Sequence, residues 1–358
     1  MVFYKAHYRQ QNLKILLVIF ILNCNKLIIN EFSFLRLLSD GETHSTQSIS
    51  KYFQCTSFEI FNVLRDVSEL GINLIEFNNK GYWLKDSINW LNSESVLKNI
   101  NQYPNVYPFD LIITDSVDST NNFLINRLEK IEEQENYKRI LVIASELQTN
   151  GRGRLGRSWV SGLGESLTFS MGWYFNSDIS KLSGLSLVIG IAIIRVFNSL
   201  SIHNVNLKWP NDIIFNYKKL GGILIEFRQS KPNRLPFIVI GIGINFNLSR
   251  NSRSLIKQDA TDLFAITNKN IDRNLMLSAL LSELQNVLIK FEKYGLNYFM
   301  EEWINYHAFQ GKKVSLYLPD NSVIEGTVDG VGHDGSLILI TKAGRSFYNI
   351  GDISLRLK

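Results

Sequence analysis

The order of apolar and polar positions divides the chain into three stretches with different patterns. Between residues 31 and 86, three short helical patterns precede two strand patterns around an Asn-Lys-Gly turn. From residue 108 to 308, apolar β-rich runs alternate with helical patterns at 121–131, 185–200 and 275–291. Residues 309–358 hold short strand patterns separated by Asp-Asn, Asp-Gly and Ala-Gly turns. We therefore expect an α+β protein of three domains behind an extension, residues 1–30.

The first stretch has the pattern of a winged helix-turn-helix domain. One helix is expected to stop at Gly41, a second to begin after Ser45, and a third after Thr56, with Glu59 completing a capping box. Three helices followed by a hairpin are typical of this domain. Along the third helix, apolar residues recur at helical spacing at Phe58, Phe61, Leu64, Val67 and Leu70.

The charge of this third helix leaves its role open. It sets Arg65 against Glu59, Asp66 and Glu69, whereas contact with DNA phosphates favours positive charge. Lys51 and Lys80 would add positive charge from the second helix and the wing. Two interpretations remain: a DNA-binding domain, or a domain retained for packing.

The middle stretch predicts a mixed sheet, and the last stretch a small β-barrel. Few helices separate many strand-like runs, which favours a mixed α+β sheet over regular βαβ winding. Short strands with tight turns are typical of a barrel. The strand-like runs of the middle stretch are LIIT, RILVIASEL, SLTFSMGWYF, VNLKWPNDIIF, GGILIEF and FIVIGIGINF.

Composition narrows the class of protein. The chain has 358 residues, 45% of them hydrophobic, and a net charge of +5, which permits an anionic ligand without demanding a nucleic acid. Two cysteines, Cys24 and Cys55, form no paired motif, so we expect a cytoplasmic protein without a disulfide framework. The five scattered histidines argue against a protein-built zinc site.

An apolar run near the start, residues 13–24, complicates the cytoplasmic prediction. It follows Lys5, Arg9 and Lys14 and so looks like the hydrophobic part of a signal peptide. It is too short for a comfortable membrane span, and no small-residue cleavage site follows it. We expect an additional segment ahead of the first domain and no membrane partner.

The run NGRGRLGRSW, residues 150–159, is the strongest candidate for chemistry. It leaves an apolar strand, so it is expected to be a loop. Glycines allow close approach of the backbone to a ligand, and the forks of Arg152, Arg154 and Arg157 match carboxylate and phosphate oxygens. A loop of this kind can become ordered around an anion.

Three further clusters carry weaker signals. In KWPND, Lys208 is a charge able to bridge two anions, and Asp212 is expected either to hold Mg²⁺ or to orient Lys208. In DSTN, Ser119, Thr120 and Asn121 present short donors and acceptors at a strand-to-helix turn, where a capping role is also expected. Glycines in KLGGILIE and GIGIN allow a strand to approach a ligand.

Taken together, the motifs resemble the biotin–protein ligase family. DSTN, GRGRLGRSW, KWPND, KLGGILIE, GIGIN and the final GDISLRL occur in the family's order across residues 31–358. With its first domain the chain looks like the bifunctional type, both ligase and biotin-operon repressor. The resemblance implies a winged helix, a central mixed-sheet catalytic domain and an SH3-like barrel. It also implies that the enzyme makes biotinyl-5'-AMP from biotin and ATP with Mg²⁺, then biotinylates a lysine.

The resemblance also implies roles for individual residues. Lys208 would lie between the biotin carboxylate and the α-phosphate, and Gln148 would contact biotin. The basic loop would close over biotin and biotinyl-AMP, with Lys208 and Arg154 as catalytic residues. The residues expected to bind biotin or the adenylate are Ser119, Thr120, Asn121, Gln148, Gly151, Arg152, Gly153, Arg154, Arg157, Lys208, Gly222, Gly243 and Asn245.

The chain departs from the family's pattern in two places. Val160 follows Trp159 where some members have an aromatic residue against adenine. Residues 250–263, at the position of the adenylate-covering loop, lack a tryptophan found in some members. The family implies a biotin carboxyl carrier protein as acceptor, with operator DNA and a second copy of the chain as further candidate partners. The alternative functions are a lipoate–protein ligase and a non-catalytic, biotin-responsive transcription regulator.

Overall fold

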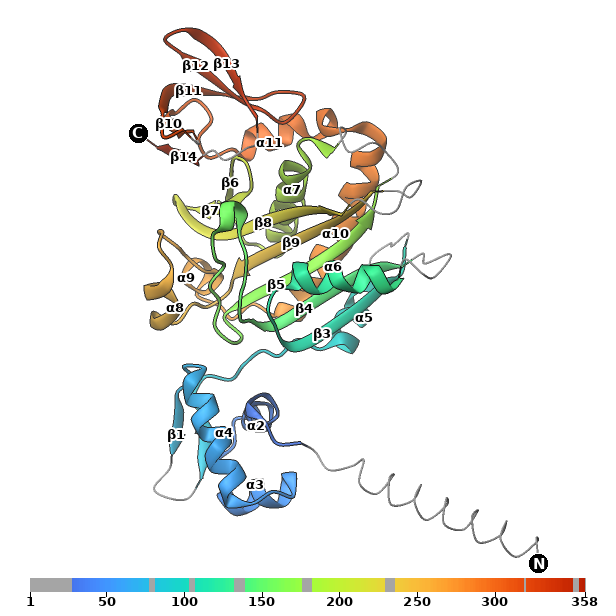
Figure 1. The fold of residues 1–358 in the computed structure, drawn as a ribbon, viewed down its shortest axis with the longest axis vertical. Helices are drawn as coiled ribbons and strands as arrows, with labels where there is room; N and C mark the ends of the chain where they lie inside the picture. Colours follow the sequence, from blue (N-terminus) through green and yellow to red (C-terminus); the bar gives the residue numbers. More distant parts are fainter. Residues whose placement is uncertain are drawn as a thin grey trace, which may run out of the picture. The chain divides into compact units, whose positions relative to one another are not determined.

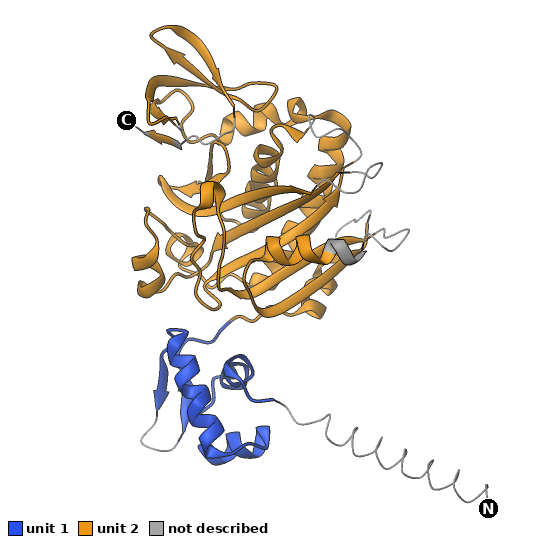
Figure 2. Ribbon diagram, viewed as in Figure 1, with its two compact units in different colours: residues 1–88 blue, residues 89–358 orange. Residues whose placement is uncertain are grey.

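The computed structural model describes residues 28–76, 81–102, 107–131, 139–175, 182–228, 236–318, 320–349 and 354–357. The chain forms two compact units, residues 1–88 and 89–358 (Figure 2). The expected extension, residues 1–30, falls almost wholly outside the described residues. Among the described residues, no helix is both long and apolar enough to span a membrane.

The first unit consists of three helices and a two-stranded antiparallel sheet (Figure 1). Its helices start where the sequence predicts, because Ser45 caps α3 and Thr56 forms the capping box with Glu59 at α4. The turn residues 77–80 lie outside the described part. The elements are α2 (Glu31–Leu38), α3 (Thr46–Phe53), α4 (Ser57–Glu69), β1 (Leu74–Glu76) and β2 (Tyr82–Leu84).

Of the five apolar residues that recur along α4 in the sequence, only Val67 is buried. Phe58 and Phe61 are 72% and 65% exposed, while Ile60, Val63 and Val67 are buried. The helix is rotated so that the β-branched residues face α2 and α3. Two large aromatic side chains are therefore exposed on a helix whose net charge is negative.

A seven-stranded mixed sheet forms the centre of the second unit, as predicted. Its strand order is β3-β4-β5-β9-β8-β7-β6, with β3 and β4 parallel and the other neighbours antiparallel. The run VNLKWPNDIIF folds into a hairpin, β6 and β7, rather than one interrupted strand. The bounds are β3 (Phe109–Val117), β4 (Ile140–Gln148), β5 (Ser166–Tyr174), β6 (Asn206–Lys208), β7 (Asp212–Phe215), β8 (Lys218–Arg228) and β9 (Phe237–Asn245).

Helices cover both faces of this sheet (Figure 1). On one face, α5 (Ser93–Ile100), α7 (Leu185–Ser199) and α10 (Arg273–Tyr294) pack into the main hydrophobic core. On the other, α6 (Thr120–Ile131) places Leu124 against Leu141, Ile143 and Phe237. The residues between the first two predicted domains include α5, whose Val96 and Ile100 are buried and which packs against α10.

A five-stranded antiparallel sheet ends the chain, in the order β13-β12-β11-β10-β14. Val314, Leu316, Leu337 and Leu339 join the same core as the central sheet, so the two sheets share one hydrophobic interior. The remaining elements are η1 (Arg154–Gly156), α8 (Arg250–Leu255), α9 (Leu263–Thr267), η3 (Leu296–Phe299), α11 (Met300–Tyr306), β10 (Lys313–Tyr317), β11 (Val323–Val331), β12 (Leu337–Thr341), β13 (Gly344–Tyr348) and β14 (Ser354–Leu357).

Candidate functional site

A pocket opens on the central sheet where the predicted motifs meet. The turn before α6, the end of β4, the basic loop and the glycine-bearing parts of β8 and β9 all contribute to it. The predicted residues Gly151, Arg157, Lys208, Asp212 and Asn245 are not part of its lining. The lining residues are Ser119, Thr120, Asn121, Gln148, Arg152, Gly153, Arg154, Trp159, Asn211, Lys219, Gly222, Ile223, Leu224, Gly241, Ile242 and Gly243.

The turn before α6 is fixed to β4 by hydrogen bonds to one side chain. The amide and hydroxyl of Thr120 donate to Oε1 of Gln148 at 2.8 and 3.1 Å. The hydroxyl of Ser170, on β5, donates to Asn121 Oδ1 at 2.5 Å and is also hydrogen-bonded to the hydroxyl of Thr120 at 2.7 Å. Ser119, Thr120 and Asn121 are all buried, so this polar wall is preorganised rather than mobile.

Trp159 lies in the pocket because β9 has a glycine beneath its ring. A Cβ atom at Gly243 would lie 2.6 Å from Cε2 of Trp159, and one at Gly151 only 2.5 Å from its carbonyl oxygen. The Nε1 atom of Trp159 and the Nε atom of Arg152 are buried without a hydrogen-bond partner within the described residues. Buried donors of this kind are costly unless something else satisfies them, which fits a ligand with acceptor atoms.

The basic loop closes on itself and on the sheet. The amide of Gly153 donates to the carbonyl of Arg157 at 2.6 Å, and that of Trp159 to the carbonyl of Gly151 at 2.8 Å. Arg154 donates to Asn211 Oδ1 at 3.3 Å. The exposed Arg157 lies outside the pocket lining, so two of the loop's three arginines, Arg152 and Arg154, line the site.

Asp212 stands between two lysines. Its carboxylate lies 2.7 Å from Nζ of Lys219 and 3.8 Å from Nζ of Lys208. Burial lowers the pKa of Lys208, and Asp212 partly opposes that shift while Lys219 adds to it. Only Lys219 lines the pocket. The sequence predicted the anion-bridging role for Lys208 and no role for Lys219, although Lys219 begins the KLGGILIE motif singled out for its glycines.

The same contacts bear on the predicted Mg²⁺ ligand. No cluster of three or more His, Cys, Asp or Glu side chains suited to a metal occurs in the described part of the chain. Asp212 is already engaged by two ammonium groups, which compete directly with a cation. The residues present do not fit a protein-built Mg²⁺ site; they fit a role for Asp212 in orienting lysines.

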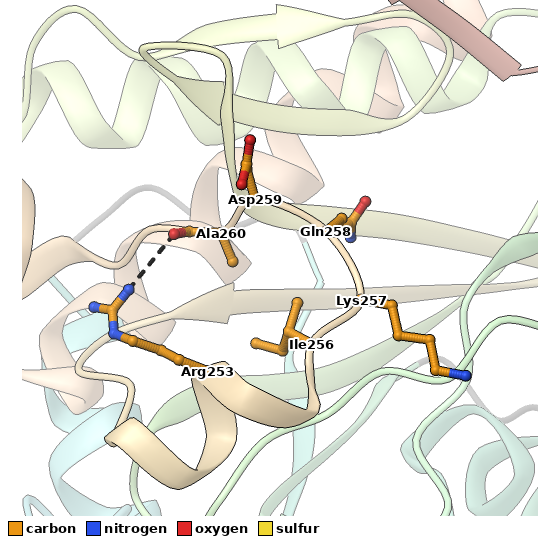
Figure 3. Close-up of a pocket in the computed structure, with 6 residues that line it drawn as sticks. All are labelled: Arg253, Ile256, Lys257, Gln258, Asp259 and Ala260. Atoms are coloured by element: carbon orange, nitrogen blue, oxygen red, sulfur yellow. Dashed lines mark hydrogen bonds between the residues drawn. The ribbon is translucent and has the colours of Figure 1, made fainter.

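The segment at residues 250–263 forms α8 and a turn that is bonded to β8. The amide of Lys219 donates to the carbonyl of Asp259, and the amide of Thr261 donates back to the carbonyl of Lys219, both at 2.9 Å. Arg253 forms an ion pair with the buried Asp262 and reaches the carbonyl of Ala260, lining an open recess (Figure 3). Asn245, predicted to contact the adenylate, donates to the carbonyl of Thr261 at 3.0 Å.

Comparison with known proteins agrees with this architecture. Residues 113–245 match the Biotin/lipoate A/B protein ligase family. The "Bifunctional ligase/repressor BirA" of Escherichia coli is 31% identical over 320 residues, covering 89% of this chain and 95% of that protein. The "Biotin--[acetyl-CoA-carboxylase] ligase" of Mycobacterium tuberculosis is 29% identical over 60% of this chain and 78% of its own length.

A solved structure shows the same central fold. The biotin protein ligase from Aquifex aeolicus in complex with biotin and ATP matches with a TM-score of 0.57 and 30% identity. The match covers 70% of this chain and 99% of that one. The mixed sheet is thus of the biotin protein ligase class. The chain belongs to the biotin/lipoate A/B protein ligase family.

Proposed function

We propose that the chain is a biotin–protein ligase, which makes biotinyl-5'-AMP and then biotinylates one lysine of a biotin carrier domain of the acetyl-CoA carboxylase type. One observation carries the proposal: a single pocket joins a rigid polar wall, a loop with two inward arginines, and Lys219. Relatives named as ligases of this kind, and the relative solved with biotin and ATP, support it.

The first step needs charge compensation more than proton transfer. The biotin carboxylate attacks the α-phosphorus of ATP, an acyl–phosphate bond forms, and pyrophosphate leaves. Both reactants are anions, so Arg152, Arg154 and Lys219 offset their repulsion and the charge that develops on the phosphoryl oxygens. Lys208 does not line the pocket but adds positive charge near it. Asp212 contacts both ammonium groups and keeps them in position.

The second step needs exclusion of water. The neutral amine of the acceptor lysine attacks the carbonyl of the mixed anhydride, an amide forms, and AMP leaves with the anhydride's bonding electrons. Competing attack by water would waste the intermediate. Arg154 bonded to Asn211 and Trp159 packed over Gly243 hold the basic loop against the pocket, which supports a role for this loop in covering the adenylate.

Mg²⁺ enters this scheme with the nucleotide. The ion prefers a few carboxylates together with substrate phosphates and water. Asp212 is already paired with Lys208 and Lys219. We therefore propose that the protein binds the phosphates through cationic side chains and supplies no carboxylate ligand to the metal.

For the flanking parts we propose a winged helix-turn-helix over the first unit and an SH3-like barrel at the end of the chain. The element order of the first unit and relatives named ligase/repressor support a repressor that binds operator DNA. Binding as a homodimer is part of the proposal and rests on the family resemblance alone. The acidic α4 with exposed Phe58 and Phe61 is the observation against it. A gel shift with DNA upstream of biotin-synthesis genes, with and without biotin and ATP, tests the repressor role.

The ligase proposal is tested by intact mass. Incubating the protein with MgATP, biotin and a carrier domain is expected to add one biotin to the carrier. A parallel incubation with lipoate distinguishes the lipoate-ligase alternative. An unmodified carrier despite biotin binding would leave the non-catalytic regulator as the better account.

A further inference from the structure

Glu226, on β8, contacts two of the pocket's motifs with one oxygen atom. Its Oε2 accepts from Nη2 of Arg152 at 2.7 Å and from Nδ2 of Asn121 at 2.7 Å. Arg152 belongs to the basic loop, whereas Asn121 begins α6, so the carboxylate joins segments distant in the sequence. Sequence reasoning gave Glu226 no role.

The two partners of Glu226 differ in how firmly they are held. Asn121 is 3% exposed, accepts from the buried Ser170 at 2.5 Å, and also donates to the carbonyl of Leu224 at 3.3 Å. Arg152 projects from a loop whose backbone bonds are mostly internal, such as Gly153 to Arg157. Glu226 is therefore fixed from the sheet side, and Arg152 is the group it restrains.

The opposite charges of Glu226 and Arg152 are suited to restraining a loop that binds anions. The Arg152 and Glu226 side chains are 34% and 26% exposed, so the pair is partly shielded from solvent. Without an anionic ligand, three positive groups, Arg152, Arg154 and Lys219, converge on the pocket. A carboxylate on Arg152 reduces their mutual repulsion and keeps the guanidinium at the pocket wall.

We propose that Glu226 is a positioning residue that holds Arg152, and with it the basic loop, in a ligand-ready arrangement before substrate arrives. Because the ion pair already restrains the loop, less conformational entropy is lost when the anion binds, which is the usual benefit of preorganisation. This inference rests on the proposed ligase function only for its kinetic consequence; the restraint on the loop is independent of it.

Limited trypsin digestion measures the restraint directly, because the loop contains Arg152, Arg154 and Arg157. We expect Glu226→Gln, which keeps an acceptor for Asn121 but removes the charge opposite Arg152, to speed cleavage in this loop about fivefold without ligand. Glu301→Gln, an exposed carboxylate on α11, is the matched control and should cleave at the wild-type rate. Cleavage of the loop in Glu226→Gln at less than about twice the wild-type rate, or equal acceleration at all tryptic sites, would overturn the proposal.

Steady-state kinetics add a second readout that general destabilisation would not produce. If wild type adenylates biotin, we expect Glu226→Gln to raise KM for biotin about fivefold with KM for ATP nearly unchanged. Glu226→Asp, which keeps the charge on a shorter stem, should recover part of the loss. An equal rise in both KM values, with unchanged digestion, would contradict the inference. A wild type without adenylation would refute the proposed function while leaving the digestion result to decide the role of Glu226.

Discussion

Lys219 and Asp212 form the tighter half of a three-residue cluster, with Nζ and Oδ1 2.7 Å apart, while Lys208 lies 3.8 Å from the same carboxylate. The closer lysine also lines the pocket, and the farther one does not. The geometry therefore adds Lys219 to Lys208, the lysine singled out in the sequence, as a candidate for binding the anions.

The first prediction compares these two lysines. Lys219→Ala is expected to slow adenylation roughly 100-fold or more, since it removes the cation that we propose to stabilise the developing phosphoryl charge. Lys208→Ala should cost about tenfold, because it acts through Asp212. Pyrophosphate release under single-turnover conditions measures both. The reverse order would return the anion-bridging role to Lys208, as the sequence predicted.

The second prediction concerns retention of the intermediate. Arg154→Ala removes the contact with Asn211 and is expected to release biotinyl-AMP into solution about tenfold faster than wild type. Chromatography of the filtrate after ultrafiltration measures the released adenylate. Slower adenylation without faster release would show that Arg154 acts on the phosphate rather than as part of the loop's closure.

The third prediction tests the fit of Trp159 above β9. Gly243→Ala places a methyl group where the indole lies, 2.6 Å from Cε2, so the ring must move into the pocket. Biotin affinity, measured by calorimetry, should fall about tenfold or more, because overpacking at such a contact commonly costs 1–3 kcal/mol. Combining it with Trp159→Leu should cost less than the sum of the single changes. Strict additivity would refute the clash.

The fourth prediction follows from His307, which lies beside Trp303 and Phe309 next to β6. Burial lowers its pKa to about 3. Between the ordinary value near 6.5 and this value, only the unfolded chain takes up the proton, so stability falls as the pH drops through that range. The loss approaches roughly 3 kcal/mol at pH 4.5 relative to pH 7.5.

Urea unfolding at several pH values checks the contribution of His307. His307→Leu is expected to flatten the acid limb of the stability curve, whereas His203→Gln, at an exposed position, should leave it unchanged. An acid limb of wild-type slope in His307→Leu would show that other groups dominate the acid sensitivity.

The fifth prediction concerns a buried ion pair. Arg273 and Glu146 lie 2.5 Å apart at 1% and 0% exposure. Arg273→Met is expected to lower the free energy of unfolding by about 3–5 kcal/mol, because it leaves a buried carboxylate without its countercharge. Adding Glu146→Met should recover part of that loss. A double variant less stable than Arg273→Met would instead assign the cost to lost packing.

Local signals in the sequence were sufficient for much of the fold. The caps at Ser45 and Thr56 and the long apolar helix from Leu185 depend on neighbouring residues, and the alternation of strand-like and helical runs was enough to predict a mixed sheet. The turn at Ser119, the basic loop and the glycine strands were separate local signals; the family resemblance implied that they form one site, and they line one pocket.

What the sequence missed depends on contacts between distant residues. Helical spacing did not distinguish the face with Phe58 from the one with Ile60, because both are apolar. Prediction of α5 would have required knowing that it packs against α10, which lies far away in the sequence. Glu226 carries no local signal, since its partners, Asn121 and Arg152, are 105 and 74 residues away. The closeness of Lys219 to Asp212 also follows from strand pairing, because the β6–β7 hairpin and the pairing of β7 with β8 bring these residues together.

The ion pair of Arg273 and Glu146 also fixes the segment that follows the first unit. Arg273 donates to the carbonyl of Asn89, Glu146 accepts from the amide of Leu91, and Asn274 donates to the carbonyl of Trp90. These backbone groups complete the interior of the larger unit and cannot be removed without leaving polar atoms unsatisfied. A chimaera that exchanges the first unit for that of a relative should therefore be joined before residue 89, and not at the start of β3.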